Sequence, residues 1–252
     1  MMVMKKQFLI TYTSLSVGWF LLMLAIFALI LGGCTKERIT GSGNVVEETR
    51  TTAPFTEVEI SGAFEVHLLQ DSSAQVVIKA EDNIMGVIET GTHGNILYVR
   101  TKNHVNIRRH MPIHIYVHSR LFQRITFSGS GSLDNKDTLQ STSFRYVLNG
   151  SANASLALAT TAISTTINGS GDLIMKGHAT TLNSDINGSG NISALDMTVQ
   201  TADITIRGSG AHTIQVEKEL RVSILGSGNV TYSGTPTKLE TDIKGSGKLI
   251  KI

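Results

Sequence analysis

The chain has 252 residues, of which 22 are basic and 20 are acidic. When Lys5 and Lys6 are set aside, basic and acidic residues balance at 20 each, so no basic excess indicates a nucleic-acid partner. Cys34 is the only cysteine, which excludes a disulfide within the chain, so the fold must be stabilised by apolar burial and backbone pairing.

Segment 1–33 has the pattern of a secretory signal. Lys5 and Lys6 precede a long uncharged, largely apolar stretch that ends in Leu31-Gly-Gly-Cys34, which resembles the lipobox of bacterial lipoproteins. We therefore predict a lipoprotein signal peptide over 1–33, lipid attachment at Cys34 and a short polar tether over 34–40. An uncleaved membrane-spanning helix is the alternative, because the apolar run is long enough to cross a bilayer.

The motif Gly-Ser-Gly recurs through the second half of the chain. Each repeat has an apolar residue two positions before its first glycine and, except at His212, another four positions after it. A flexible linker would not hold apolar residues at fixed places, so the motif marks a structural repeat. Its first glycines, 18 to 21 residues apart, are Gly129, Gly150, Gly169, Gly188, Gly208, Gly226 and Gly245.

Short alternating runs rich in Ile, Val and Leu favour strands over helices in these repeats. A repeat of this length suits a parallel β-solenoid, in which neighbouring coils stack about 4.8 Å apart. A coil of about 19 residues has a contour of roughly 60 Å, enough for two or three short strands around a thin apolar core. The sequence therefore predicts an all-β fold, a parallel β-helix (solenoid) with about 19-residue coils.

The Gly-Ser-Gly motif is interpreted as a corner of the coil. A residue without Cβ takes the positive φ of an abrupt turn and allows the same corner of the next coil to lie directly above it. The serines between the glycines then form a column, and we expect their hydroxyl groups to hydrogen-bond from coil to coil. We expect a second such column from Asn149, Asn168 and Asn187.

Residues 41–126 carry a weaker form of the pattern. We predict that they form N-terminal β coils with irregular insertions, continuous with a regular solenoid over 127–252. Segments 39–45 and 60–66 fit the corner register, whereas the motif is absent from 67–112, although strand-like alternation persists there. A separate small β domain over 53–120 is the alternative.

Several of these features together resemble a known bacterial family. They are the lipobox, the segment Phe55–Gly62, the strand pattern of Pro112–Val117 and the recurring Ile-x-Gly-Ser-Gly. Over about residues 40–250 the chain resembles the family named putative auto-transporter adhesin, head GIN domain. The resemblance implies a right-handed parallel β-helix on a secreted or lipid-anchored protein, and it brings no catalytic or binding residues.

His110, His114 and His118 have the four-residue spacing of helical metal ligands. Pro112 and the alternating apolar residues favour a strand, where residues four apart are separated by about 13 Å. One ion cannot bridge that distance, because its ligands lie only about 2 Å from it. We expect His114 and His118 to line a solvent face, and His212 to occupy a tolerated edge position.

The carboxylates predict neither a catalytic pair nor a repeated cation site. Asp185 and Asp242 lie about three coils apart, or roughly 14 Å, beyond the separation of a glycosidase pair. Asp172 follows the motif in one coil only, whereas Ca²⁺-binding repeats need a recurring Asp. We predict no catalytic residues, no metal and no cofactor, with a single Ca²⁺ site as the alternative.

These patterns predict a non-enzymatic, exported protein, lipid-anchored in the cell envelope at the outer membrane or the cell surface. Long polar solenoid faces suit extended partners, so we expect a glycan or protein partner, although the sequence identifies no ligand-binding residue. One alternative is a polysaccharide-acting enzyme that gathers Asp71, Glu81, Asp82 and Glu89. The other is a structural protein that self-assembles through an open edge at 248–252.

Overall fold

A computed structural model describes residues 37–252. The predicted signal peptide over 1–33 and the lipidated Cys34 lie outside the described residues. Within 37–252, no helix combines the length and apolar character needed to span a membrane. Residues 39–252 form one compact unit.

This unit consists almost entirely of strands, with one short helix, α2 (Asp82–Met85). The strands are β1 (Glu37–Thr40), β2 (Val45–Thr51), β3 (Glu57–Gln70), β4 (Gln75–Glu81), β5 (Ile88–His93), β6 (Ile96–Thr101), β7 (Val105–Arg108), β8 (His114–Ser119), β9 (Arg124–Asn135), β10 (Leu139–Gly150), β11 (Asn153–Gly169), β12 (Asp172–Gly188), β13 (Asn191–Gly208), β14 (Ala211–Gly226), β15 (Asn229–Ser233), β16 (Lys238–Gly245) and β17 (Lys248–Lys251).

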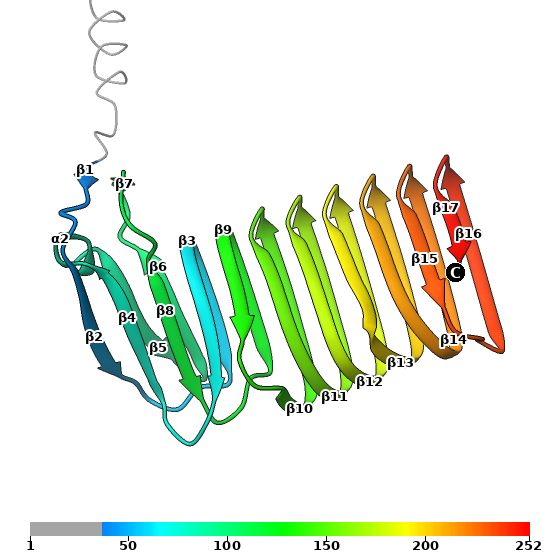
Figure 1. Ribbon diagram of the computed structural model, residues 1–252, viewed down its shortest axis with the longest axis horizontal. Helices are drawn as coiled ribbons and strands as arrows, with labels where there is room; N and C mark the ends of the chain where they lie inside the picture. The colour runs from blue at the N-terminus through cyan, green and yellow to red at the C-terminus, as the bar shows by residue number, and fades with distance from the viewer. Residues whose placement is uncertain (1–36) are drawn as a thin grey trace, which may run out of the picture. The chain divides into compact units, whose positions relative to one another are not determined.

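The strands from β9 onward form the predicted parallel β-solenoid. Neighbouring coils pair in parallel from β9 through β14 and on to β15, β16 and β17, side by side in Figure 1. The stack has about 7 turns of about 19 residues. Alternate side chains along each strand point into the shaft, so Leu182 and Ile186 are fully buried while Asn183 between them is exposed.

The glycine corners superimpose as predicted. Gly169 pairs with Gly150 on one side and with Gly188 on the other, and each has a φ near +140°. A Cβ on any one of them would collide with the carbonyl oxygen of the glycine in the preceding coil. That oxygen also accepts a hydrogen bond from the backbone amide of the corner serine in the following coil. For example, Ser189 N donates to Gly169 O at 3.0 Å.

The serine column is held differently from the expectation. Of the corner serines, all of which lie within the described residues, only Ser246 and Ser227 hydrogen-bond through their hydroxyl groups, with 3.0 Å between the two Oγ atoms. The backbone amides of the serines already make the contact between coils, and the side chains at this convex corner point to solvent. The expected asparagine column is confirmed: Asn168 Nδ2 donates to Asn149 Oδ1 at 2.8 Å, and Asn187 Nδ2 donates to Asn168 Oδ1 at 2.9 Å.

The N-terminal part combines one solenoid coil with antiparallel strands. Gly62 in β3 pairs with Gly129 in β9, so segment 60–66 joins the corner column as predicted. On its other edge β3 pairs in parallel with β6 and β8, and β4 then runs antiparallel to both β8 and β2. We call β2, β4, α2, β5, β6 and β8 the cap. One apolar core extends from Phe55 in front of β3 to Tyr232 in β15 and includes the cap.

The expectation that segment 39–45 repeats the corner is wrong. β2 pairs only with β4, in the antiparallel direction, so Gly41 and Gly43 do not join the glycine column. Acidic and amide side chains at the end of β4 bind this loop instead. Gly43 N donates to Glu81 Oε1 at 2.6 Å, and Asn44 Nδ2 donates to Asp82 Oδ2 at 2.9 Å.

The last coil leaves apolar side chains exposed. Leu239 and Ile243 of β16 pair with the buried Leu220 and Ile224 of β14, but are 45% and 39% exposed. All of β16 is exposed, whereas the first coil, β3, is covered by the cap. Self-association of the solenoid would depend on this edge.

His212 is not at an edge, which corrects the expectation for it. It is fully buried in the column that holds Ile192 below it and Val230 above it. Neither ring nitrogen has a hydrogen-bond partner within 37–252, and burial lowers the pKa of His212 to about 3. The folded chain therefore holds His212 neutral.

Substitution of a corner glycine should destabilise the whole stack. Gly169→Ala would place a Cβ against the carbonyl oxygen of Gly150 at positive φ, and we expect a loss of roughly 1–3 kcal/mol in the free energy of unfolding, measured by urea denaturation. Gly86→Ala is the matched control, because Gly86 has a φ of −70° and open space at its Cβ. Equal stability of the two variants would contradict the stacked corner.

His212 should make the fold sensitive to acid. The unfolded chain binds a proton at His212 below about pH 6.5, whereas the folded chain resists it down to about pH 3, so stability falls as pH drops through this window. Between pH 7.5 and 4.5 we expect the wild type to lose roughly 2–3 kcal/mol more than His212→Leu, measured by urea denaturation. The same pH dependence in both proteins would refute this role for His212.

Candidate functional site

A column of charged and polar side chains runs along the outside of the coils. Its members occupy equivalent positions in successive strands, so each lies about 4.8 Å from the next. It begins at Glu57 in β3 and ends at Glu240 in β16, with Arg145 and Asn183 in between. The charged column consists of Glu57, Arg124, Arg145, Ser164, Asn183, Asp203, Arg221 and Glu240.

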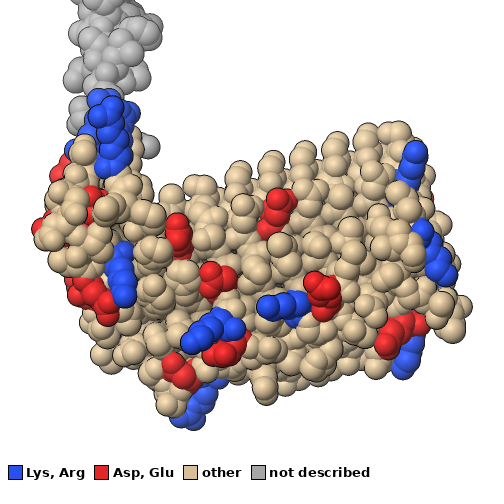
Figure 2. All heavy atoms as spheres, in the orientation of Figure 1, with Lys and Arg blue, Asp and Glu red and all other residues tan. Residues whose placement is uncertain are grey.

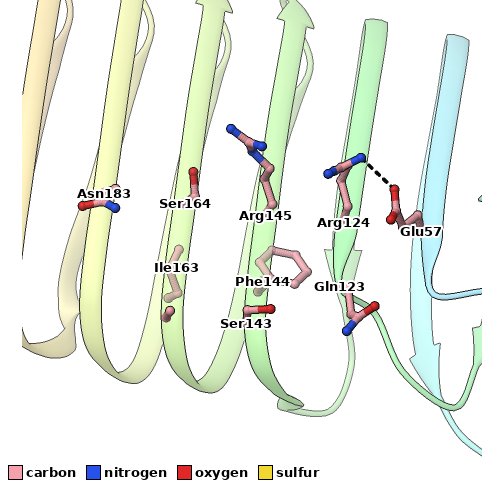
Figure 3. Close-up of a pocket in the computed structure, with 10 residues that line it drawn as sticks. Glu57, Gln123, Arg124, Ser143, Phe144, Arg145, Ile163, Ser164 and Asn183 are labelled. Carbon is pink, nitrogen blue, oxygen red and sulfur yellow. Dashed lines mark hydrogen bonds and ion pairs between the residues drawn. The ribbon is translucent and has the colours of Figure 1, made fainter.

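Two arginines are direct neighbours in this column. Arg124 Nη1 donates to Glu57 Oε2 at 2.8 Å, and the dashed line in Figure 3 marks this pair. Arg145 lies on the next coil, and it makes no ion pair with any residue of 37–252. Like charges directly opposite each other on paired strands destabilise a sheet, so the Arg124–Arg145 pair lowers the stability of this sheet.

A shallow hollow of about 490 Å³ lies beside Arg145. Figure 3 shows Arg124 and Arg145 extending from adjacent strands along one side of it, with Ser164 and Asn183 on the following coils. The space exists because Ser143, Ala162 and Ser164, which line it together with the long arginines, have short side chains. The other lining residues are Glu57, Gln123, Ser143, Phe144, Ala162 and Ile163.

At the far end of the column the charges are paired with one another. Arg221 Nε donates to Glu240 Oε2 at 2.8 Å, and Lys238 Nζ lies 2.8 Å from Glu240 Oε1. Hydrogen bonds from Lys238 and Arg221 lower the pKa of Glu240, while the hydrogen bond to Glu240 raises that of Arg221. Arg221, Lys238 and Glu240 thus satisfy one another, whereas Arg145, and Asp203 next to Arg221, make no ion pair with any residue of 37–252.

Charges are sparse elsewhere on the solenoid. Figure 2 shows one face, where several acidic and basic side chains lie next to each other and most of the coil surface carries neither charge. A second hollow, of about 460 Å³, lies among loops beside the cap and is lined mainly by apolar surface; it includes Pro54, Phe55 and Leu121. It contains one charged residue, Arg120, at its rim.

The acidic residues of the proposed enzyme alternative are each engaged elsewhere. Glu81 is buried and accepts from the backbone amides of Gly43 and Met111, and Asp82 accepts from Ser42 at 2.5 Å. Glu89 pairs with Arg100. Burial would raise the pKa of Asp71, but hydrogen bonds from Ser73 and His118 outweigh it and lower that pKa. These carboxylates serve as structural acceptors in the cap and its loops.

The histidines of β8 and the segment before it do not converge. His110 Nδ1 lies 2.7 Å from the carbonyl oxygen of Met111, and His118 Nδ1 lies 2.7 Å from Asp71 Oδ2. His114 faces a residue that the sequence did not single out, His67 of β3, with 3.3 Å between Nδ1 of His114 and Nε2 of His67. Asp185 pairs with Arg207 and Asp242 with Lys244.

Sequence reasoning did not identify Arg145 or its neighbours as a site. The signal lay in the repeat itself, because Arg124 and Arg145 both stand five residues before a corner glycine. An alignment of the outward positions of the coils places these two arginines side by side.

Comparisons with known proteins agree with this architecture. A crystal structure of a putative adhesin from Bacteroides fragilis NCTC 9343 superimposes with a TM-score of 0.81 at 20% identity, covering 85% of this chain and 100% of that chain. A putative lipid binding protein from Parabacteroides distasonis ATCC 8503 gives 0.73 at 21%, covering 86% and 100%, and a putative adhesin from Parabacteroides merdae ATCC 43184 gives 0.68 at 19%, covering 86% and 99%. At this identity the likeness shows the fold alone.

No curated protein sequence matches the chain. The family model described as "Putative auto-transporter adhesin, head GIN domain" matches residues 54–236, which contain the cap from β4 onward, the glycine corners up to Gly226 and the hollow beside Arg145. The chain belongs to this family of adhesin-like proteins.

Proposed function

We propose that this protein is a non-enzymatic adhesin of the cell envelope or cell surface that binds an acidic polysaccharide along the charged column. Membership of an adhesin family supports a binding role. The observation that carries the choice of ligand is Arg145, a guanidinium beside a second arginine, without an ion pair among residues 37–252 and next to a hollow.

The chemistry of the hollow suits a sugar acid. A guanidinium presents a planar fork that matches a carboxylate or sulfate with two parallel hydrogen bonds. Ser164, Asn183 and Gln123 offer donors and acceptors for sugar hydroxyl groups next to that fork. A neutral glycan would leave the charge of Arg145 unused.

The length of the column suits an extended polymer. Its eight positions span roughly 34 Å at about 4.8 Å per coil, and they form a flat file across parallel strands. Asp203 and Glu240 lie toward the far end, so an acidic chain would bind best over the coils of β9 to β12. The partner therefore contacts several coils, each through one outward side chain.

Removal of Arg145 should weaken this binding selectively. We expect Arg145→Ala to reduce affinity for polygalacturonate at least about tenfold, because a hydrogen bond from a charged donor is worth roughly 1.5–3 kcal/mol. The measurement is binding of the purified full chain, in detergent, to a surface that carries polygalacturonate. A surface that carries uncharged dextran is the control.

Arg221→Ala is the matched control for Arg145→Ala. It lies in the same column, but Glu219 and Glu240 already hold its guanidinium, at 2.6 and 2.8 Å. The control should bind polygalacturonate within about twofold of the wild type. Equal binding of dextran and polygalacturonate, or equal losses in both variants, would exclude the acidic ligand.

We also propose that a lipid on Cys34 anchors the protein to a membrane. The Leu31-Gly-Gly-Cys34 sequence supports this, together with the predicted signal peptide before it. Cys34→Ala should move the protein from the membrane fraction to the soluble fraction and abolish incorporation of radiolabelled palmitate. Continued membrane association of Cys34→Ala without label would instead favour an uncleaved helix.

A further inference from the structure

A cluster of ligand-type side chains lies where β3 passes between β8 and β9. Glu65 and His67 are on the same side of β3, because residues two apart in a strand share a face. Glu65 pairs with His114 of β8, and His67 pairs with Tyr116 of β8 and Asp134 of β9. The side chains of Glu65, His67 and His114 are partly exposed, at 42%, 25% and 34%.

Three potential ligand atoms converge in this cluster. His67 Nε2 and His114 Nδ1 are 3.3 Å apart, and Glu65 Oε2 lies 3.4 Å from His114 Nδ1. All three atoms lie within 4.8 Å of one another. Tetrahedral zinc with ligands at about 2.0–2.1 Å places neighbouring ligand atoms about 3.3 Å apart, which the two separations from His114 Nδ1 match.

With both imidazoles neutral, this arrangement places two acceptors against one donor. Asp134 Oδ1 lies 2.9 Å from His67 Nδ1, and a neutral His67 that donates its Nδ1–H to this oxygen has Nε2 left as an acceptor. Glu65 is a second acceptor when ionised, and both face the single proton that His114 Nδ1 can carry. A cation between the three atoms would satisfy all of their lone pairs at once.

The surroundings hold the imidazole rings in place. Asp134 fixes the tautomer and orientation of His67, as carboxylates do for histidine ligands in zinc sites. Tyr116 stacks against His67 with ring centroids 4.7 Å apart and against His114 at 6.4 Å. Lys79 lies over the Tyr116 ring and is held there by Glu47 at 2.9 Å.

We propose that Glu65, His67 and His114 bind one Zn²⁺ ion, with water in the fourth position and Asp134 as the positioning residue of His67. Two imidazole nitrogens and one carboxylate are a ligand set that zinc accepts. The site joins β3 of the first coil to β8 of the cap, so the bound ion stabilises the cap against the solenoid. This inference is independent of the polysaccharide proposed for the charged column.

Calorimetric titration of the metal-free full chain in detergent with ZnCl₂ tests the proposal. We expect one ion per chain and affinities at least about tenfold weaker for His67→Ala and for His114→Ala. Asp134→Asn should also weaken binding, by roughly 10–100-fold, because it removes the carboxylate that orients His67 and leaves all three ligands in place. The control is His118→Ala, on the same strand and face but paired with Asp71, which should bind as the wild type does.

Thermal unfolding provides a second readout. At one fixed zinc concentration, the melting temperature of the wild type and of His118→Ala should rise by about 5 °C, and that of His114→Ala should rise by less. Similar unfolding of all proteins without metal would show that the variants fold. Absence of zinc uptake by the wild type, or uptake that survives both histidine substitutions, would overturn the proposal.

Discussion

The structure depends on one steric constraint, the superposition of glycine on glycine at a single corner of every coil. The carbonyl oxygen of Gly150 occupies the space where a Cβ of Gly169 would lie, and the same relation recurs at Gly188. Because the corner admits no side chain, each coil can settle on the one below it in only one register. Inward and outward alternation along every strand then follows from that register.

This register turns positions along the chain into neighbours across the surface. Residues one coil apart lie about 4.8 Å from each other, so equivalent outward residues of successive coils form a continuous column across the strands. Asn149, Asn168 and Asn187 use this geometry for a chain of amide hydrogen bonds. Arg124 and Arg145 use it to bring two cations together, which a sheet optimised for stability would avoid.

The regular coils could be predicted from the sequence because their contacts repeat at a fixed interval. The cap could not, since its contacts obey no period: β6 and β8 both pair with β3, and β4 runs antiparallel to its neighbours β8 and β2. His67 and His114 are 47 residues apart for the same reason. The sequence likewise did not show that the backbone amides of the corner serines, rather than their hydroxyl groups, would connect neighbouring coils.

The cap covers the open strand edge of the first coil. The first coil would otherwise present an open strand edge, and β6 and β8 pair with that edge while β4 and β2 extend the sheet antiparallel. Antiparallel strands break the repeat, so no further coil can add there. Glu65, His67 and His114 lie on the seam between these two patterns, where the coil and the cap share backbone pairing only along β3. Two solenoid coils are joined by backbone hydrogen bonds along nearly their whole length. Side-chain contacts across the seam therefore contribute more to holding the cap on β3 than such contacts contribute between two coils.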